Sequence, residues 1–104
     1  MLLAPYSETE VRALVSHYLV LSHYRHRPWI MVRLLDLELA VAHLDDVERG
    51  VTVLHGVLGL SQRAVADLLD VSQSTLGRAY PGAMPLLLER MNADPPQGSE
   101  RARD

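Results

Sequence analysis

Two short helix-like segments, residues 61–69 and 72–80, are separated by only two residues, Asp70 and Val71. Each segment opens with Ser-Gln, and serine is a preferred helix N-cap because its hydroxyl accepts a hydrogen bond from a nearby backbone N–H. Such a short connection forces the two helices to cross steeply and to touch near the corner. This corner restricts what the chain can fold into more than any other feature of the sequence.

The steric demands of a steep crossing are met at this corner. The two helices need a small residue where they meet, and Ala66 occupies that place. The turn needs a residue that tolerates left-handed backbone, for which Asp70 is a second choice after glycine. The apolar residues that seal the corner are Val65, Leu69, Val71, Leu76 and Ala79. The pattern predicts a helix-turn-helix unit, and an ordinary helical hairpin in a small bundle is the alternative.

The first part of the chain is expected to form helices over residues 7–44. Ser-Glu-Thr-Glu at 7–10 is a capping box that opens a first helix, and Pro28 suits the first turn of a second helix over 28–44. This second helix is apolar almost all round, at Trp29, Ile30, Val32, Leu34, Leu35, Leu37, Leu39, Val41 and Leu44. Such a helix is either central in the core or shared with a partner subunit.

The remaining residues continue the helical pattern. Asp45 and Glu48 form a second capping box, which opens a unit over 45–81 that contains the helix-turn-helix and that the Pro-Gly pair at 81–82 is expected to end. A short last helix is expected over 83–92, followed by a disordered tail over 93–104 that is rich in proline, glycine and charge. We therefore expect one all-α domain over 1–92, a small orthogonal bundle of about five helices.

Composition excludes several classes of protein. The chain has 104 residues, which fits one domain, and it has no cysteine, which excludes disulfides, thiolate metal sites and cysteine nucleophiles. Its N-terminal residues lack the basic region of a signal peptide, and no apolar run is long enough to span a bilayer. We expect a cytoplasmic protein, in a bacterial cell or a phage-infected host.

The sequence gives no sign of catalytic chemistry. The five histidines do not occur at the spacings of known metal ligands. Ser72 and Ser74 are not part of a recognisable nucleophile arrangement, and there is no glycine-rich phosphate loop. We therefore expect no metal, no cofactor and no enzymatic activity.

The exposed face of the second segment suggests a partner. In a helix-turn-helix protein, this helix lies in the major groove of double-stranded DNA, and its N-terminal residues contact base edges. Glutamine pairs with adenine, arginine with guanine, and serine with either a base or a phosphate. The predicted base contacts are therefore Gln73, Ser74 and Arg78, and the expected function is that of a sequence-specific transcriptional regulator.

A longer stretch, LDDVERGVTVLHGVLGLSQRAVADLLDVSQSTLGRAY at residues 44–80, resembles region 4 of sigma-70-type factors and the sigma-like phage regulators of the ArpU and RinA type. The resemblance implies a DNA-reading helix in which Ser72 and Thr75 contact the DNA backbone, and a preceding helix that touches the DNA backbone through Ser61 and Arg63. The chain departs from the pattern at Gly77, where the family often has a longer side chain, and it has no room for the other sigma regions.

Charge poses a problem for DNA binding. The formal net charge is −3, and within residues 61–80 two arginines are balanced by two aspartates, whereas phosphate contacts supply most non-specific affinity. One source of the missing positive charge is residues 23–29, with Arg25 and Arg27 as a phosphate clamp, and a solvated loop is the alternative. A homodimer through helix 28–44 would also double the phosphate contacts. The acidic stretch 36–48 is expected to stay off the DNA, facing RNA polymerase or solvent.

Two other functions remain open at this point. A DNA-packaging accessory similar to a small terminase subunit would use the same helix and would form a ring-shaped oligomer. A protein-binding module that acts on RNA polymerase without DNA would fit the acidic balance.

Overall fold

Seven helical elements follow one another in the computed structural model, which describes residues 5–93 and has no strand in that range. They are α1 (Glu8–Ser16), α2 (Tyr18–Ser22), α3 (Pro28–Ala42), α4 (Asp46–Val51), the π-helix η1 (Thr52–Val57), α5 (Gln62–Leu69) and α6 (Gln73–Ala93). The expectation of a small all-α bundle is confirmed. The predicted tail over 93–104 lies outside the described residues, apart from Ala93, which ends α6.

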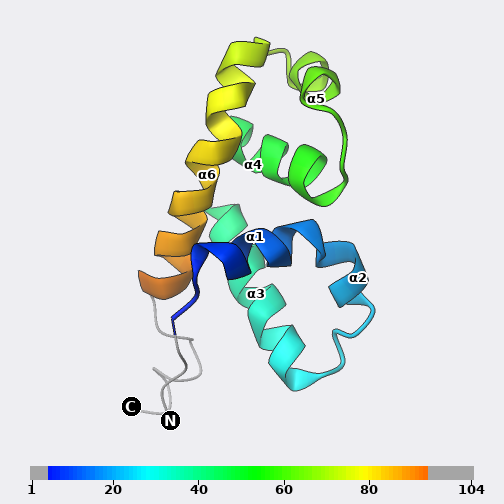
Figure 1. The fold of residues 1–104 in the computed structure, drawn as a ribbon, viewed down its shortest axis with the longest axis vertical. Helices are drawn as coiled ribbons and strands as arrows, with labels where there is room; N and C mark the ends of the chain where they lie inside the picture. Colours follow the sequence, from blue (N-terminus) through cyan, green and yellow to red (C-terminus); the bar gives the residue numbers. More distant parts are fainter. Residues whose placement is uncertain (1–4, 94–104) are drawn as a thin grey trace.

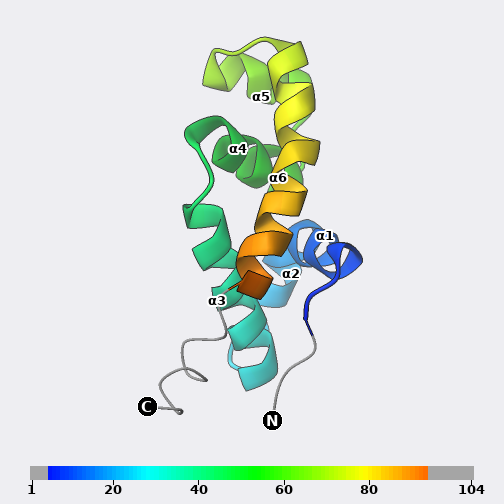
Figure 2. The same cartoon turned by 90° about the vertical axis from the view of Figure 1, so that its left-hand side faces the viewer.

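Helix α6 runs along the long axis of the molecule and takes part in two apolar cores (Figure 1). Its N-terminal half packs with α4 and α5 around an upper core of Val51, Val65, Ala66 and Leu76. Its C-terminal half packs with α1 and α3 around a lower core of Val11, Leu14, Val15, Leu37, Ala40, Leu44, Ala83, Met84, Leu87 and Met91. Tyr80 packs against both cores. The view turned by 90° also shows α4 and α5 beside the N-terminal half of α6, and α1 and α3 beside its C-terminal half (Figure 2).

The prediction that Pro81 and Gly82 end the second segment is wrong, and so is the separate last helix over 83–92. Helix α6 continues through Pro81 and Pro85 to Ala93. A proline inside a helix costs about 3 kcal/mol, whereas burying one leucine or methionine side chain stabilises by about 1.5–3 kcal/mol. The C-terminal half of α6 buries three such side chains, of Met84, Leu87 and Met91, so burial offsets the two prolines, whose rings both face solvent.

The expected first helix is interrupted. Helix α1 ends at Ser16, and His17, with φ −109° and ψ 15°, separates it from α2. The Nδ1 atom of His17 lies 2.9 Å from the carbonyl oxygen of Ala13, so the imidazole contacts a backbone group of the preceding turn. The sequence does not mark this break, because Tyr18 and Leu21 keep helical spacing with Val11 and Leu14 across it.

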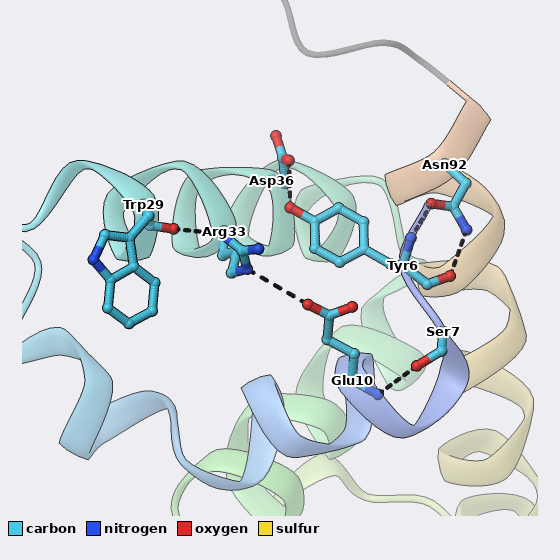
Figure 3. A network of polar contacts seen from close by, with 7 residues as sticks. All are labelled: Tyr6, Ser7, Glu10, Trp29, Arg33, Asp36 and Asn92. Atoms are coloured by element: carbon cyan, nitrogen blue, oxygen red, sulfur yellow. Dashed lines mark hydrogen bonds and ion pairs between the residues drawn. The ribbon is translucent and has the colours of Figure 1, made fainter. Parts of the chain in front are cut away.

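Hydrogen bonds fasten the segment before α1 to α3 and α6 (Figure 3). The backbone N–H of Tyr6 donates to Oδ1 of Asn92 at 2.7 Å, and Nδ2 of Asn92 donates to the carbonyl of Tyr6 at 3.0 Å. The Tyr6 hydroxyl donates to Asp36 of α3 at 2.7 Å, and Arg33 of α3 lies 3.4 Å from Glu10 of α1. These contacts hold the first and last described elements together.

The second capping box is confirmed, because Asp45 accepts from the backbone N–H of Glu48 at 2.8 Å and the Glu48 carboxylate accepts from that of Asp45 at 3.1 Å. The helix that it opens changes to a π-helix at Thr52, which the sequence did not predict. Gly59 ends this element with a positive φ of 79°. A side chain at Gly56 would meet Val15 at 2.7 Å, so this glycine permits the close approach of η1 to α1.

A cavity of about 250 Å³ lies where α1, α2, α3 and η1 meet. Its lining is almost entirely apolar, formed by Val15, Tyr18, Leu37, Glu38, Val41, Thr52, Val53 and Val57. Its polar groups have partners inside the chain: the Thr52 hydroxyl donates to the carbonyl of Glu48, and the Tyr18 hydroxyl donates to the Glu38 carboxylate. None of the helices within residues 5–93 combines the length and apolarity needed to cross a membrane.

Candidate nucleic-acid interface

The corner between α5 and α6 is built as the sequence predicts. Ser61 caps α5 by accepting a hydrogen bond from the backbone N–H of Ala64 at 3.1 Å. Asp70 ends α5 in the left-handed conformation, with φ 58° and ψ 47°. The backbone N–H of Val71 then reaches back to the carbonyl of Ala66 at 3.1 Å, which is the hydrogen bond that closes a helix through a left-handed residue. The turn is therefore held by backbone geometry.

Packing fixes the angle at which α6 leaves this corner. Ala66 is 2% exposed, and Val65 and Leu76 are fully buried against it. Gly50 of α4 permits a further close approach, because a side chain there would lie 2.8 Å from Leu69. Because these residues are close-packed at the crossing, they fix how α5 and α6 sit against each other.

The side chains of Ser72 and Thr75, at the start of α6, already form hydrogen bonds within the chain. The Ser72 hydroxyl oxygen accepts from the backbone N–H of Thr75 at 3.0 Å, and the same hydroxyl donates to the Thr75 hydroxyl at 2.9 Å. The predicted role of these two side chains as DNA backbone contacts therefore competes with capping. The first turn of α6 contains no acidic residue, so the partial positive charge of the helix N-terminus is not neutralised by a side chain.

The three residues predicted to contact bases lie on the outer side of α6. Gln73, Ser74 and Arg78 are all exposed, and within residues 5–93 none of their side chains takes part in a hydrogen bond or ion pair. Their helical spacing places them on one face of the first turn and a half of α6. This face is polar, carries one positive charge and is free of intramolecular contacts.

Gly77 lies in the middle of this face and has no structural role of its own. A Cβ atom added there would meet only Oε1 of Gln62, at 3.9 Å, and φ is not in the left-handed region. Glycine inside a helix costs about 1 kcal/mol relative to alanine. The fold therefore tolerates an unfavourable residue at a point where the α6 backbone is open to close approach by a ligand. The resemblance to sigma region 4 had marked Gly77 only as a departure from the family pattern.

The structure places Arg25 and Arg27, the predicted phosphate clamp, away from the N-terminal half of α6. The loop that carries both arginines joins α2 to α3, at the end of the molecule opposite the α5–α6 corner (Figures 1 and 2). Arg25 donates two hydrogen bonds to Glu38, at 2.8 and 2.7 Å. These bonds, with a smaller contribution from the Tyr18 hydroxyl, lower the pKa of Glu38. Arg27 lies over the Tyr24 ring, 5.8 Å from its centre.

The acidic stretch 36–48 is largely engaged inside the chain. Asp36 accepts from Tyr6, Glu38 from Arg25 and Tyr18, and Asp45 and Glu48 cap α4. Asp46 pairs with Arg49 at 2.6 Å. Arg49 also donates to the carbonyl of Leu44 at 3.3 Å. Glu48 and Arg49 therefore both have structural roles within the chain.

Charge around the corner is balanced. Arg63 and Asp67 are exposed on α5, Asp70 is exposed in the turn, and Arg78 is exposed on α6. No ion pair joins any of these four within the described part of the chain. A single copy of this surface therefore presents two arginines to an anionic partner. The same surface also brings two carboxylates near that partner.

Metal ligands do not gather in residues 5–93, where no three histidine, aspartate or glutamate side chains come together. His43 and His55 each place Nδ1 against a backbone carbonyl, at 2.8 and 2.7 Å, and His55 also contacts the Tyr80 ring edge to face.

Comparison with known proteins adds no relative: no protein-family model matches the chain, and no curated protein or solved structure is significantly similar to it.

Proposed function

We propose that the chain is a sequence-specific DNA-binding protein that regulates transcription, with the N-terminal half of α6 in the major groove. One observation carries this proposal: Gln73, Ser74 and Arg78 form an exposed polar face without partners in the described chain. A left-handed corner and a buried core hold this face in a fixed orientation. Rigid elements that present unpaired polar side chains suit direct reading of base edges.

The chemistry of the face matches base recognition. Gln73 can bond to N6 and N7 of adenine, and Arg78 to O6 and N7 of guanine, each through two hydrogen bonds. Gly77 lets the α6 backbone approach the groove floor between them. Arg63 and the unneutralised N-terminus of α6 supply the phosphate contacts, and the Ser61 hydroxyl lies at the start of the adjoining helix.

The resemblance of residues 44–80 to sigma region 4 supports a role in transcription, in which RNA polymerase is a further partner. This support comes from the corner and the face that follows it. It does not come from the acidic stretch, because those carboxylates have intramolecular partners.

Binding of one copy to DNA should be weak and only slightly dependent on salt. Arg63, as the one arginine assigned to a phosphate, predicts a slope of about −0.9 for the logarithm of the binding constant against that of the salt concentration. Discrimination between sites should come mainly from Gln73 and Arg78, because each good bidentate pair is worth about 1–3 kcal/mol against the wrong base.

The test is a selection from random duplex DNA at low salt. The wild-type chain should enrich a short motif, and the Gln73→Ala/Arg78→Ala variant should lose it. Thr9→Ala/Arg12→Ala is the matched control, because it removes the same charge from α1, which lies outside the α5–α6 corner. Enrichment of the same motif by the double variant, or no enrichment by the wild type, would contradict the proposal.

A protein-binding module is the second candidate, and one observation favours it. Leu68 on α5 is 65% exposed, and Leu58 and Leu60 before α5 are 52% and 37% exposed, so the motif also presents apolar surface. For this function Leu68→Glu should abolish capture of RNA polymerase while Gln73→Ala has no effect. A DNA-binding slope near zero against salt would favour this candidate over the first.

A further inference from the structure

Helix α3 carries apolar side chains on the side that faces away from the cores. Its inner side is formed by Ile30, Leu34, Leu37 and Ala40, all of which are buried. Its outer side, which we call the α3 outer face, is formed by Pro28, Val32, Leu35, Leu39 and Ala42. Leu35 is 43% exposed and Leu39 is 55% exposed.

The sequence had allowed this apolar helix to be either central in the core or shared with a partner. Helix α3 packs against α1, α2 and α6, and it lies along one side of the lower half of the molecule (Figure 2). Its inner side alone completes the lower core. Burial inside the chain therefore explains Ile30, Leu34, Leu37 and Ala40 and leaves the outer face unexplained.

The spacing of the α3 outer face is that of a coiled-coil seam. Steps of four, three, four and three residues separate its five members along the chain. This is the alternation of a and d positions in a heptad repeat, which turns one narrow apolar stripe toward a second helix. Val32 and Leu39 occupy a positions and Leu35 a d position, so the three large side chains of the seam lie in the middle of α3.

Charge on α3 argues for a neutral partner helix. The charged side chains of α3 are all engaged within the same chain: Arg33 with Glu10, Asp36 with Tyr6, and Glu38 with Arg25. No unpaired charge on α3 remains to select an acidic or a basic partner. A second copy of the same face brings no unpaired like charges together and buries apolar surface on both sides.

The chain's own C-terminal residues do not offer a cover. The sequence Asp-Pro-Pro-Gln-Gly-Ser-Glu-Arg-Ala-Arg-Asp over 94–104 contains no large apolar side chain. Residues 1–4 contain three large apolar side chains and are the competing occupant, which the experiment below distinguishes.

We infer that the α3 outer face is a homodimer seam, in which α3 packs in parallel against α3 of a second copy. The parallel orientation rests on the proposed function, because it places both α5–α6 corners at the same end of the dimer, where one DNA duplex can reach them. An antiparallel pair would place them at opposite ends. The seam itself rests only on the spacing, exposure and neutral charge of the face.

The small area of the α3 seam limits the affinity of this dimer. A helix of 15 residues is about 22 Å long, and a seam of that length and about 10 Å width buries well under the ~800 Å² per partner of a standard interface. We therefore expect a reversible dimer with a dissociation constant on the order of 10–100 µM. Simultaneous binding to one DNA duplex would strengthen it through effective concentration.

The first experiment is sedimentation equilibrium without DNA, over about 5–500 µM, a range that brackets the expected constant. The wild type and the control Leu68→Glu should shift from monomer to dimer, whereas Leu35→Glu should remain monomeric throughout. Both substitutions place one carboxylate on an exposed apolar site of a helix. A wild type that stays monomeric over this range would overturn the inference, as would a Leu35→Glu variant that dimerises like the control.

Cover by residues 1–4 is tested by their removal. If these residues occupied the face, the intact chain would be monomeric and only the truncated chain would associate, and this result would also overturn the inference. Because no DNA is present, failure of the seam and failure of the proposed function give separate results.

The second experiment fixes the orientation and does not require a charged substitution. The chain has no cysteine, so Leu39→Cys places a single thiol on the seam and Leu68→Cys a single thiol elsewhere. In a parallel pair each a-position residue meets its own copy, within reach of a disulfide, which needs Cα atoms about 4.4–6.8 Å apart. Leu39→Cys should form a covalent dimer under mild oxidation, and Leu68→Cys should not. A sedimenting dimer that cannot be cross-linked at position 39 would refute the parallel arrangement.

Discussion

Two glycines of α6 allow stability and DNA recognition to be separated. Gly77 lies on the face proposed to enter the groove, and Gly82 lies about a turn and a half further along the same helix. Both are exposed, and neither has a positive φ. A Cβ atom at Gly82 would meet nothing within 4 Å, and one at Gly77 would meet only Gln62 at 3.9 Å.

The expected effect on stability follows from helix propensity alone. Alanine is favoured over glycine by about 0.8–1.0 kcal/mol inside a helix, and no contact of the folded chain opposes either substitution. For a domain of this size about 1 kcal/mol corresponds to roughly 4–8 °C in Tm. Thermal denaturation followed by circular dichroism should show Gly77→Ala and Gly82→Ala raising Tm by similar amounts within this range.

The expected effect on DNA binding differs between the two variants. Gly77→Ala should weaken binding to the selected site, because a methyl group then separates the α6 backbone from the groove, whereas Gly82→Ala should leave it unchanged. Fluorescence anisotropy with the selected duplex measures both. Equal affinities for the two variants would refute the argument that Gly77 is retained for close approach, and a lower Tm for Gly77→Ala would refute the argument that the site is sterically open.

Three further predictions concern the fold. Asp70→Gly should stabilise the chain by roughly 0.5–1 kcal/mol, because glycine adopts the left-handed turn without strain. Asp70→Val should destabilise the chain by about 1–2 kcal/mol. Urea denaturation measures the free energy of unfolding of both variants. Val53→Ile adds one methyl group to the lining of the cavity and should stabilise by about 0.8 kcal/mol, seen as a higher urea midpoint. Arg25 lowers the pKa of Glu38, so the stability from this pair is present above the unfolded pKa of about 4.3 and is lost as pH falls through the folded pKa. Tm should therefore fall less steeply below about pH 4.5 in Glu38→Gln than in the wild type, and parallel curves would contradict the assignment.

The corner was predictable because local chemistry determines it. The hydroxyls of Ser61 and Ser72 cap the helices that follow them, and Asp70 adopts the left-handed turn that its position requires. Small and apolar residues at the crossing fill the upper core as expected. Each of these features depends on residues only a few positions apart, so the sequence pattern contains the information needed.

The features that the sequence did not predict depend on tertiary contacts. Pro81 appeared to end a helix, yet burial of residues beyond it keeps α6 continuous. The bend into a π-helix at Thr52 brings η1 close to α1 at Gly56, a contact between segments about forty residues apart. Arg25 appeared available for phosphate, but its partner Glu38 lies on another helix. Because Arg25 pairs with this carboxylate, its positive charge is not available for a DNA phosphate.

Continuity of α6 has a consequence for the spacing of DNA sites. The C-terminal half of α6 packs directly against α3, and the N-terminal half carries Gln73 and Arg78, so in the inferred dimer no flexible linker separates the seam from either DNA-contacting face. Rigid dimers recognise half-sites at one separation, about one helical turn of 10–10.5 base pairs or a multiple of it. Inserting five base pairs between selected half-sites turns one to the opposite side of the duplex, and affinity should fall to that of a single half-site. Affinity that does not depend on this insertion would show that the two faces act independently, and would separate the DNA-binding helix from the α3 seam.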